Sequence, residues 1–97
     1  MTNWKYDHSL TKTEIDNLKS RAESALRWAN ATLSYIPELE KNHNNTDSFS
    51  RMFNSMSDMT WDVIELEKQM TEITERFDRE EKEEERKREE EREREET

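Results

Sequence analysis

The feature that most constrains this chain is a pair of seven-residue apolar repeats on either side of a short polar segment. The first repeat consists of Ile15, Leu18, Ala22, Ala25, Ala29, Thr32, Ile36 and Leu39, of which only Thr32 is polar. The second consists of Phe49, Met52, Met56, Met59, Val63, Leu66, Met70, Ile73 and Phe77, all apolar. Residues at this spacing lie along one side of an α-helix. The sequence therefore predicts two helices, at about 12–41 and 48–78.

The residues that flank the repeats indicate where each helix begins and ends. Thr11 and Glu14 have the spacing of a capping box, in which each side chain accepts a backbone N–H that the helix leaves free. Pro37 has no backbone N–H, so it predicts a kink or short break near residues 35–37. Residues 42–47, NHNNTD, predict a turn, because Asn and Asp side chains hydrogen-bond to the nearby backbone. Since the chain has no glycine, we expect an asparagine wherever this turn requires a positive φ.

Two helices of similar length that are joined by a short turn fold back on each other. Each repeat spans roughly 30 residues, or about 45 Å of helix. We therefore predict an all-α fold, an antiparallel two-helix hairpin with a coiled-coil-like seam and a charged C-terminal helical extension. The expected organisation is an N-terminal arm at 1–10, the hairpin at 11–78 and a charged low-complexity tail at 79–97.

The register of the hairpin follows from mirroring the chain about residues 44 and 45. Small side chains of the first helix then meet large ones of the second, as in Ala25 opposite Val63, which is how packed helices interdigitate. The mirrored register also brings Phe77 beside the N-terminal arm, where Trp4 and Tyr6 can cover it. We interpret the methionines of the second repeat as core residues; the alternative is an adaptable recognition surface.

The apolar surface is wider than one helical hairpin can bury. Large apolar residues flank the repeats, and an amphipathic helix with so wide an apolar face needs more than one neighbour. The predicted partner interface consists of Leu26, Trp28, Leu33, Tyr35, Phe53, Trp61 and Ile64. It serves either a homodimer that forms a four-helix bundle or a hetero-complex with helices of another protein. The alternative is a set of isolated exposed apolar residues, which are common on protein surfaces.

Composition excludes several classes of function. The chain has no cysteine, and no Gly-rich phosphate loop, Cys/His metal spacing or Ser/His/Asp arrangement is present. His8 and His43 have no evident catalytic partner. We therefore expect no enzyme, with no catalytic, cofactor-binding or metal-binding residues. The net charge of −9 and the absence of a basic stripe argue against nucleic acid as a partner, and the lack of a long apolar run argues against membrane insertion and for a cytoplasmic protein.

The C-terminal tail is almost entirely charged. Residues 78–97 contain twelve acidic and seven basic residues, which gives −5 of the net charge of −9. Acid-before-base pairs four residues apart, such as Glu84 with Arg88 and Glu90 with Arg94, favour a solvated helix that continues beyond its partner. We interpret the tail as a solubilising extension, and the alternative is a spacer or a handle for a basic partner.

Two matched helices and a central turn in a short chain resemble the W-x-G-type helical-hairpin proteins of bacterial type VII secretion. Members of that group carry an aromatic-x-x-x-acid element near the end of the second helix, and Phe77-Asp78-Arg79-Glu80-Glu81 has this form. The turn lacks W-x-G, as it can in the partners of LXG toxins, so the resemblance is to that branch. It implies a targeting partner, adaptor or chaperone that pairs through its helices and presents Phe77 and Glu81 as an export motif. It also implies export without a cleaved signal peptide.

Two further functions are compatible with the sequence. Small acidic helical proteins of phages and mobile elements inhibit host proteins, and the net charge of −9 permits that role. A coiled-coil subunit of a larger assembly would also use the apolar repeats. All three functions are non-enzymatic and depend on a protein partner.

Overall fold

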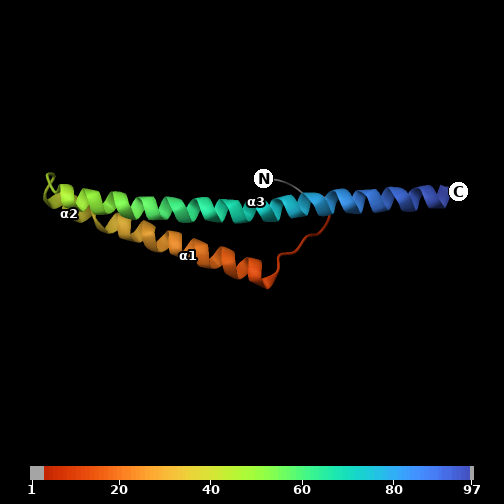
Figure 1. The fold of residues 1–97 in the computed structure, drawn as a ribbon, viewed down its shortest axis with the longest axis horizontal. Coiled ribbons are helices and arrows are strands. Elements are labelled where there is room, and N and C mark those ends of the chain that lie inside the picture. Colours follow the sequence, from red (N-terminus) through yellow and green to blue (C-terminus); the bar gives the residue numbers. More distant parts are fainter. Residues whose placement is uncertain (1–3, 97) are drawn as a thin grey trace.

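The computed structural model describes residues 4–96 and consists of three helices, with no strand in that range. Helices α1 (Lys12–Ser34) and α2 (Ile36–Lys41) run antiparallel to the first part of the long helix α3 (Thr46–Glu96), as Figure 1 shows. The molecule is a rod of 80 × 22 × 15 Å. The predicted all-α helical hairpin is confirmed. The first three residues of the expected arm and the last residue of the tail lie outside the described residues.

The ends of α1 are set by the residues that the sequence singled out. The Thr11 hydroxyl accepts the backbone N–H of Glu14 at 3.1 Å, and the Glu14 carboxylate accepts the backbone N–H of Thr11 at 2.8 Å. This completes the predicted capping box. At the other end, α1 breaks at Tyr35. Pro37 lies in the first turn of α2, where a backbone N–H has no acceptor within the helix, so the proline costs no hydrogen bond. The break predicted near residues 35–37 is therefore confirmed.

The turn between α2 and α3 is held by asparagine side chains. The Asn42 side-chain oxygen, Oδ1, accepts the backbone N–H of Asn44 at 3.0 Å. Asn45 caps α3, since its side-chain oxygen accepts the backbone N–H of Ser48 at 3.1 Å. No residue in the described part of the chain has a positive φ, so this turn contains no position of the kind for which we expected an asparagine.

Helix α3 continues without a break through the charged tail, far beyond the start of α1 (Figure 1). Ion pairs one helical turn apart line this extension. Arg86 contacts Glu83 at 2.6 Å and Glu90 at 2.8 Å, and the predicted pair of Glu84 with Arg88 has a separation of 3.3 Å. Such exposed pairs each stabilise a helix by about 0.2–0.5 kcal/mol, which favours a solvated helix where there is nothing to pack against.

The surface of α3 that faces α1 is rotated by one residue from the predicted seam. Met52, Met59, Leu66 and Ile73 are partly covered, as expected, but the alternate members of the repeat are not. The exposed fractions are 59% for Phe49, 38% for Met56, 47% for Val63 and 54% for Met70. The residues directly before them are covered in their place, with Ser48, Ser55 and Asp62 buried and Gln69 half-buried. The prediction that the whole second repeat packs against the first helix is wrong.

Helix α1 is rotated in the same sense. Ile15 and Ala22 of the first repeat are exposed, whereas the preceding residues Glu14 and Arg21 reach across to α3. Glu14 pairs with Arg76 at 2.7 Å and Arg21 pairs with Asp62 at 2.9 Å. Buried polar groups must find partners, and these ion pairs satisfy the polar side of each helix inside the hairpin. The apolar side is consequently turned away from it.

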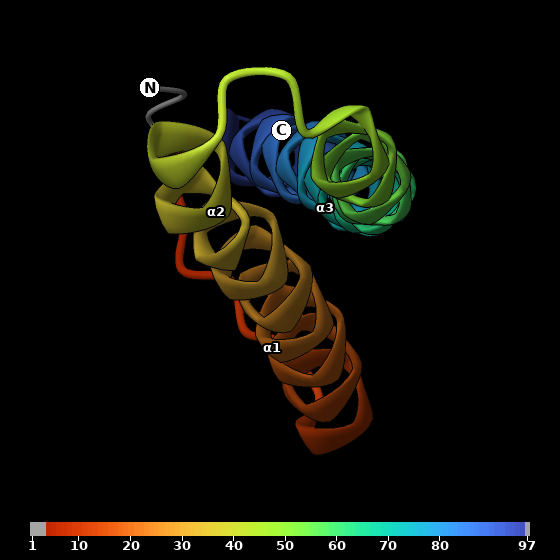
Figure 2. The same ribbon diagram turned by 90° about the vertical axis from the view of Figure 1, so that its left-hand side faces the viewer.

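Figures 1 and 2 show that α1 diverges from α3 toward its own N-terminus, after which the chain returns to α3. A cavity of about 230 Å³ lies in this open end of the hairpin. It is lined by Glu14, Asn17, Leu18, Gln69, Glu72, Ile73, Arg76 and Arg79. The mostly polar lining explains why the helices do not close tightly here: the Arg76–Glu14 ion pair spans the gap instead of apolar contact.

Candidate functional site

The side of the hairpin that carries the unburied repeat residues forms one open apolar face. Successive helical residues are about 100° apart, so a residue that follows an α1-facing position of α3 points about 100° to one side of α1. In antiparallel helices the same one-residue step turns both side chains toward the same side of the pair. The open apolar face consists of Ile15, Ala22, Leu26 and Leu33 of α1 and Phe49, Met56, Val63 and Met70 of α3.

The opposite side of the hairpin is polar. A hollow there is lined by Asn17, Ser20, Arg21, Ser24, Arg27 and Gln69. Asp62 lies at the base of this side, where it accepts hydrogen bonds from the Ser24 hydroxyl at 2.5 Å and from Arg21 at 2.9 Å. These bonds, that of Ser24 first, lower the pKa of Asp62. The two sides of the hairpin therefore differ in kind, and only one of them offers an apolar docking surface.

The apolar row of α3 extends past the start of α1 and ends at Phe77. Phe49, Met56, Val63, Met70 and Phe77 are spaced by seven residues, so they lie on one line along the helix. Phe77 is only 7% exposed, and it is the one buried apolar side chain of residues 4–96. The N-terminal arm covers it. Trp4 meets the Phe77 ring edge-on at 5.1 Å, and the His8 ring stacks on it at 4.8 Å between ring centroids.

Glu81 holds the backbone of this arm. One carboxylate oxygen accepts the N–H of Lys5 at 2.6 Å, and the other accepts the N–H of Tyr6 at 3.0 Å. The second oxygen also contacts Nε2 of His8 at 2.9 Å. Partial burial by itself raises the pKa of Glu81, but the hydrogen bonds from Lys5, His8 and Tyr6 outweigh it and lower the pKa overall. Glu81 therefore binds the arm as a carboxylate.

Three further contacts fix the side chains of the arm. The Trp4 indole N–H donates to Asp78 at 3.2 Å, and the Lys5 ammonium pairs with Glu85 at 3.0 Å. The Tyr6 hydroxyl donates to Glu85 as well. These two donors, Tyr6 first, lower the pKa of the Glu85 carboxyl. Every arm side chain from 4 to 6 thus has a partner on α3, and Lys5 and Tyr6 share Glu85.

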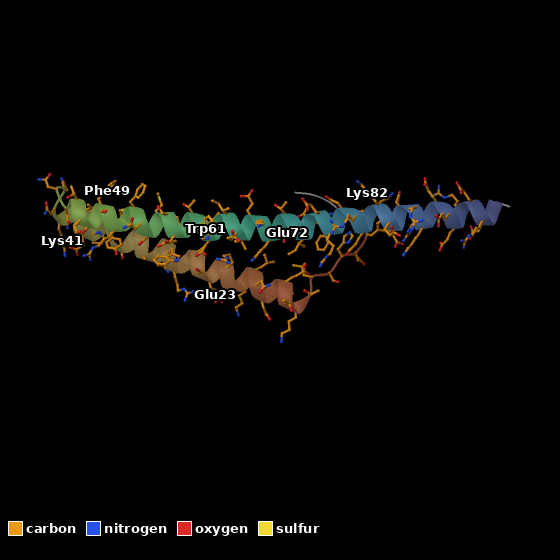
Figure 3. The ribbon with its side chains drawn as sticks, in the orientation of Figure 1. Glu23, Lys41, Phe49, Trp61, Glu72 and Lys82 are labelled. Atoms are coloured by element: carbon orange, nitrogen blue, oxygen red, sulfur yellow. The ribbon has the colours of Figure 1, made fainter. Side chains whose placement is uncertain are left out.

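The predicted interface residues fall into three groups. Leu26 and Leu33 belong to the open apolar face, whereas Phe53 lies on the same line of α3 as Ile64, three helical turns away. Trp28 and Tyr35 lie one and two heptads beyond Arg21, on the row of α1 that faces α3, so the hairpin itself supplies part of their contacts. Trp61 and Ile64 are exposed on α3 away from both α1 and the open apolar face; Figure 3 marks Trp61 midway between Phe49, near the turn, and Glu72. Phe77 and Glu81, the expected export motif, lie together beneath the arm.

Several contributors to these surfaces were not predicted as site residues. Phe49, Met56, Val63 and Met70 were assigned to the internal seam, and His8 was not assigned to any contact with Phe77. The predicted cover of Phe77 by Trp4 is confirmed, whereas Tyr6 lies farther along α3, beneath Arg88 at 4.7 Å. A signal for the rotation was present in the sequence: Ser48, Ser55, Asp62 and Gln69 repeat with the same seven-residue spacing.

Within residues 4–96 no cluster of three His, Cys, Asp or Glu side chains is placed to bind a metal ion. Over the same range, no helix combines the length and the apolar character that crossing a bilayer requires. Comparison with protein-family models, with curated protein sequences and with solved structures finds no match to this chain.

Proposed function

We propose that this protein is a non-enzymatic helical interaction module whose open apolar face packs against helices of another protein. The observation that carries the proposal is the exposure of Phe49, Met56, Val63 and Met70 in one row, between 38% and 59% each. A single exposed apolar residue needs no explanation. Four of them at heptad spacing, with Leu26 and Leu33 beside them, form the contiguous patch that is typical of an interaction site.

The direction of the row favours a four-helix arrangement. In a bundle of four antiparallel helices each helix has two neighbours about 90° apart. The row on α3 points about 100° away from α1, which is close to the direction of a second neighbour. Ile15 and Ala22 of α1 point to the same side. A partner that presents two helices, or a helical hairpin of its own, would therefore complete the bundle.

The open apolar face can supply part of the free energy that association requires. Fully burying an exposed Val, Met or Phe side chain contributes about 1.5–3 kcal/mol, and the four row residues are 38–59% exposed before they bind. Their further burial therefore offsets part of the association cost, which is about 4–15 kcal/mol. Leu26 and Leu33 add to this, and an aromatic residue such as Phe49 is a favoured anchor at interfaces.

The resemblance to the LXG-toxin partners of type VII secretion supports a more specific role, that of a targeting partner or chaperone. In this role the open apolar face binds the helices of the exported protein, and the Phe77–Glu81 element is recognised for export. Capture of an exported helical protein from the native host, together with loss of its export in a Phe77→Ala variant, would support this role.

Two adjacent substitutions test the interaction surface. Val63 and Ile64 are β-branched and almost equally exposed, at 47% and 49%, but only Val63 belongs to the open apolar face. We expect Val63→Glu to abolish assembly, measured as solution mass by light scattering and as partner capture from the native host. Ile64→Glu is the matched control and should leave assembly intact. Equal effects of the two variants on a folded chain contradict the proposal.

A further inference from the structure

The Phe77 end of α3 has the features of a binding site with its ligand in place. The ligand is the N-terminal arm, which is not helical between Trp4 and Leu10. It is held through two consecutive backbone N–H groups on one carboxylate, that of Glu81, and through side-chain contacts to Phe77, Asp78 and Glu85. Recognition of backbone and side chains together is how proteins bind short peptides.

The histidine of the arm has a geometry that only one protonation state satisfies. Nδ1 of His8 lies 2.8 Å from a Glu80 oxygen, and Nε2 lies 2.9 Å from a Glu81 oxygen. A neutral imidazole carries a proton on one nitrogen only, and its other nitrogen is an acceptor. Two carboxylates at these distances can both be satisfied only by the doubly protonated ring. The ring is also well enclosed, with a side-chain exposure of 5%.

We propose that residues 77–85 of α3 form a peptide-binding site for a bent aromatic–basic–aromatic–x–His segment, that the arm at 4–8 is its resident ligand, and that binding requires His8 protonated on both nitrogens. This proposal is independent of the partner proposed for the open apolar face. It concerns the one position of the apolar row that the chain covers by itself.

The titratable groups around His8 are mostly carboxylates, which favour the protonated ring. From α3 these groups are Glu80, Glu81, Glu83, Glu84, Arg76 and Lys87, and from the arm they are Tyr6 and Asp7. Arg76 is partly neutralised by Glu80 at 3.5 Å and by Glu14 at 2.7 Å. In agreement, the hydrogen bond to Glu80 raises the pKa of His8; burial opposes this and the bond to Glu81 adds to it.

Loss of one proton from His8 leaves a nitrogen lone pair facing a carboxylate. The contact to Glu80 or to Glu81 is then lost, and the arm is released from the Phe77 ring. Release exposes Phe77 and extends the open row of α3 by one heptad. A segment of the same chemistry from another molecule can occupy the site only while its own histidine is doubly protonated, so it competes with the arm at low pH and does not replace it at high pH.

The experiment uses the full-length chain and a synthetic peptide of residues 1–9, MTNWKYDHS. In the chain, Trp4→Ala with His8→Ala weakens the resident arm and leaves the α3 site unchanged. Calorimetric titration should show that the peptide binds this variant at pH 6, and that the affinity falls about tenfold or more by pH 8.5. Wild-type chain should bind the peptide far more weakly, because its own arm competes at high effective concentration.

Two controls identify the site. A chain that also carries Glu81→Gln should lose the peptide, and a peptide with His8→Gln should bind more weakly at pH 6, with a smaller change of affinity between pH 6 and pH 8.5. If a folded arm-weakened chain does not bind the peptide at pH 6, or binds it equally at pH 8.5, the proposal is wrong.

A measurement on the wild-type fold covers the case in which the arm-weakened chain does not fold. His43 lies in the exposed turn, and the variant His43→Gln leaves His8 as the only histidine signal in the NMR spectrum. Hydrogen exchange of the Lys5 and Tyr6 amides, corrected for the intrinsic effect of pH, should accelerate about tenfold or more as the His8 signal titrates. Protection that does not change through that titration overturns the proposal.

Discussion

Five large apolar residues lie on one line of helix α3: Phe49, Met56, Val63, Met70 and Phe77. The first four are exposed to solvent, whereas Phe77 is buried. Phe77 is 7% exposed, whereas the other four are exposed by 38% or more. The difference is in what lies above them. The arm returns to α3 and covers Phe77, while α1 contacts a different side of α3 and leaves the rest of the row open.

This comparison shows that a seven-residue apolar repeat does not by itself specify its partner. The hairpin uses the adjacent row, with Asp62 bonded to Arg21 and Ser24, to hold α1. A buried carboxylate is stable only with such partners, so the polar contacts determine the orientation of the helices. The apolar row remains available for another chain, except at Phe77, which the aromatic rings of Trp4 and His8 cover.

The largest expected effect is the difference in stability between a variant that truncates the covered residue of the row, Phe77, and one that truncates an exposed residue of the row, Met70. Phe77→Ala should lower the free energy of unfolding by about 3 kcal/mol, the low end for truncating a buried phenylalanine. Met70→Ala should cost less than about 1 kcal/mol, because the monomer leaves Met70 in water. Urea unfolding at low protein concentration measures both. Comparable losses would mean that Met70 is covered in solution.

A smaller effect is expected from the polar row that faces α1. Asp62→Ala should lower the Tm by a few degrees, since it leaves Arg21 and Ser24 without their acceptor inside the hairpin. Asp58→Ala removes an exposed carboxylate one turn away and should leave the Tm nearly unchanged. Thermal unfolding followed by circular dichroism makes the comparison. If the two variants melt together, the Asp62 contacts do not determine how α1 is oriented.

The covered end of the row should also depend on pH. The pKa of His8 is raised in the fold by Glu80 and then Glu81, so its stabilising contribution is complete below the unfolded value of about 6.5 and is lost as pH rises through the folded value. The pKa values of Glu81 and Glu85 are lowered, so their contributions are lost instead as pH falls through the folded values.

The difference in Tm between wild type and His8→Gln should therefore be largest near pH 5.5–6 and should shrink toward pH 8.5. Thermal scans across this range provide the test. A difference that grows with pH would mean that the neutral ring, and not the imidazolium, holds the arm. The open part of the row has no titrating contact of this kind, so Val63→Ala serves as the pH-independent comparison.

The smallest effect is expected at the end of α3, which neither the arm nor α1 touches. Removing residues 90–97 should reduce the helical signal in circular dichroism but change the free energy of unfolding by less than about 0.5 kcal/mol, because exposed ion pairs contribute little. A larger loss in urea unfolding would indicate that the tail packs against something in solution.

The sequence predicted the elements of this fold because their signals are local. The capping box of Thr11 and Glu14, the break before Pro37, the asparagine turn and the charged helical tail each depend on residues within about one helical turn of each other. The contacts Arg21–Asp62, Ser24–Asp62 and Glu14–Arg76 have their midpoints at residues 41.5, 43 and 45, close to the mirror point of the predicted register, whereas Val63, predicted to pack opposite Ala25, is 47% exposed. Even the cover of Phe77 by Trp4 followed from this register.

The candidate site was predicted less completely. The sequence indicated an apolar surface too wide for one hairpin and named Leu26 and Leu33, which belong to the open apolar face. It assigned Val63 and Met70 to the interior because they share a row with Phe77. The sequence-based prediction also assigned Trp61 and Ile64 to this interface, although the structure places both residues away from the open apolar face.

What the sequence by itself determined is the set of helices and the rows that run along them, because helical periodicity fixes how neighbouring residues are arranged on one element. Which row faces the other helix was decided only by the tertiary structure. Adjacent rows differ by a single residue, or about 100° of rotation, and both repeat every seven residues. The choice depends on whether Asp62 meets Arg21 and Ser24, and on whether His8 reaches Glu80 and Glu81. Those contacts join residues far apart in the chain, so their geometry exists only once the hairpin has closed.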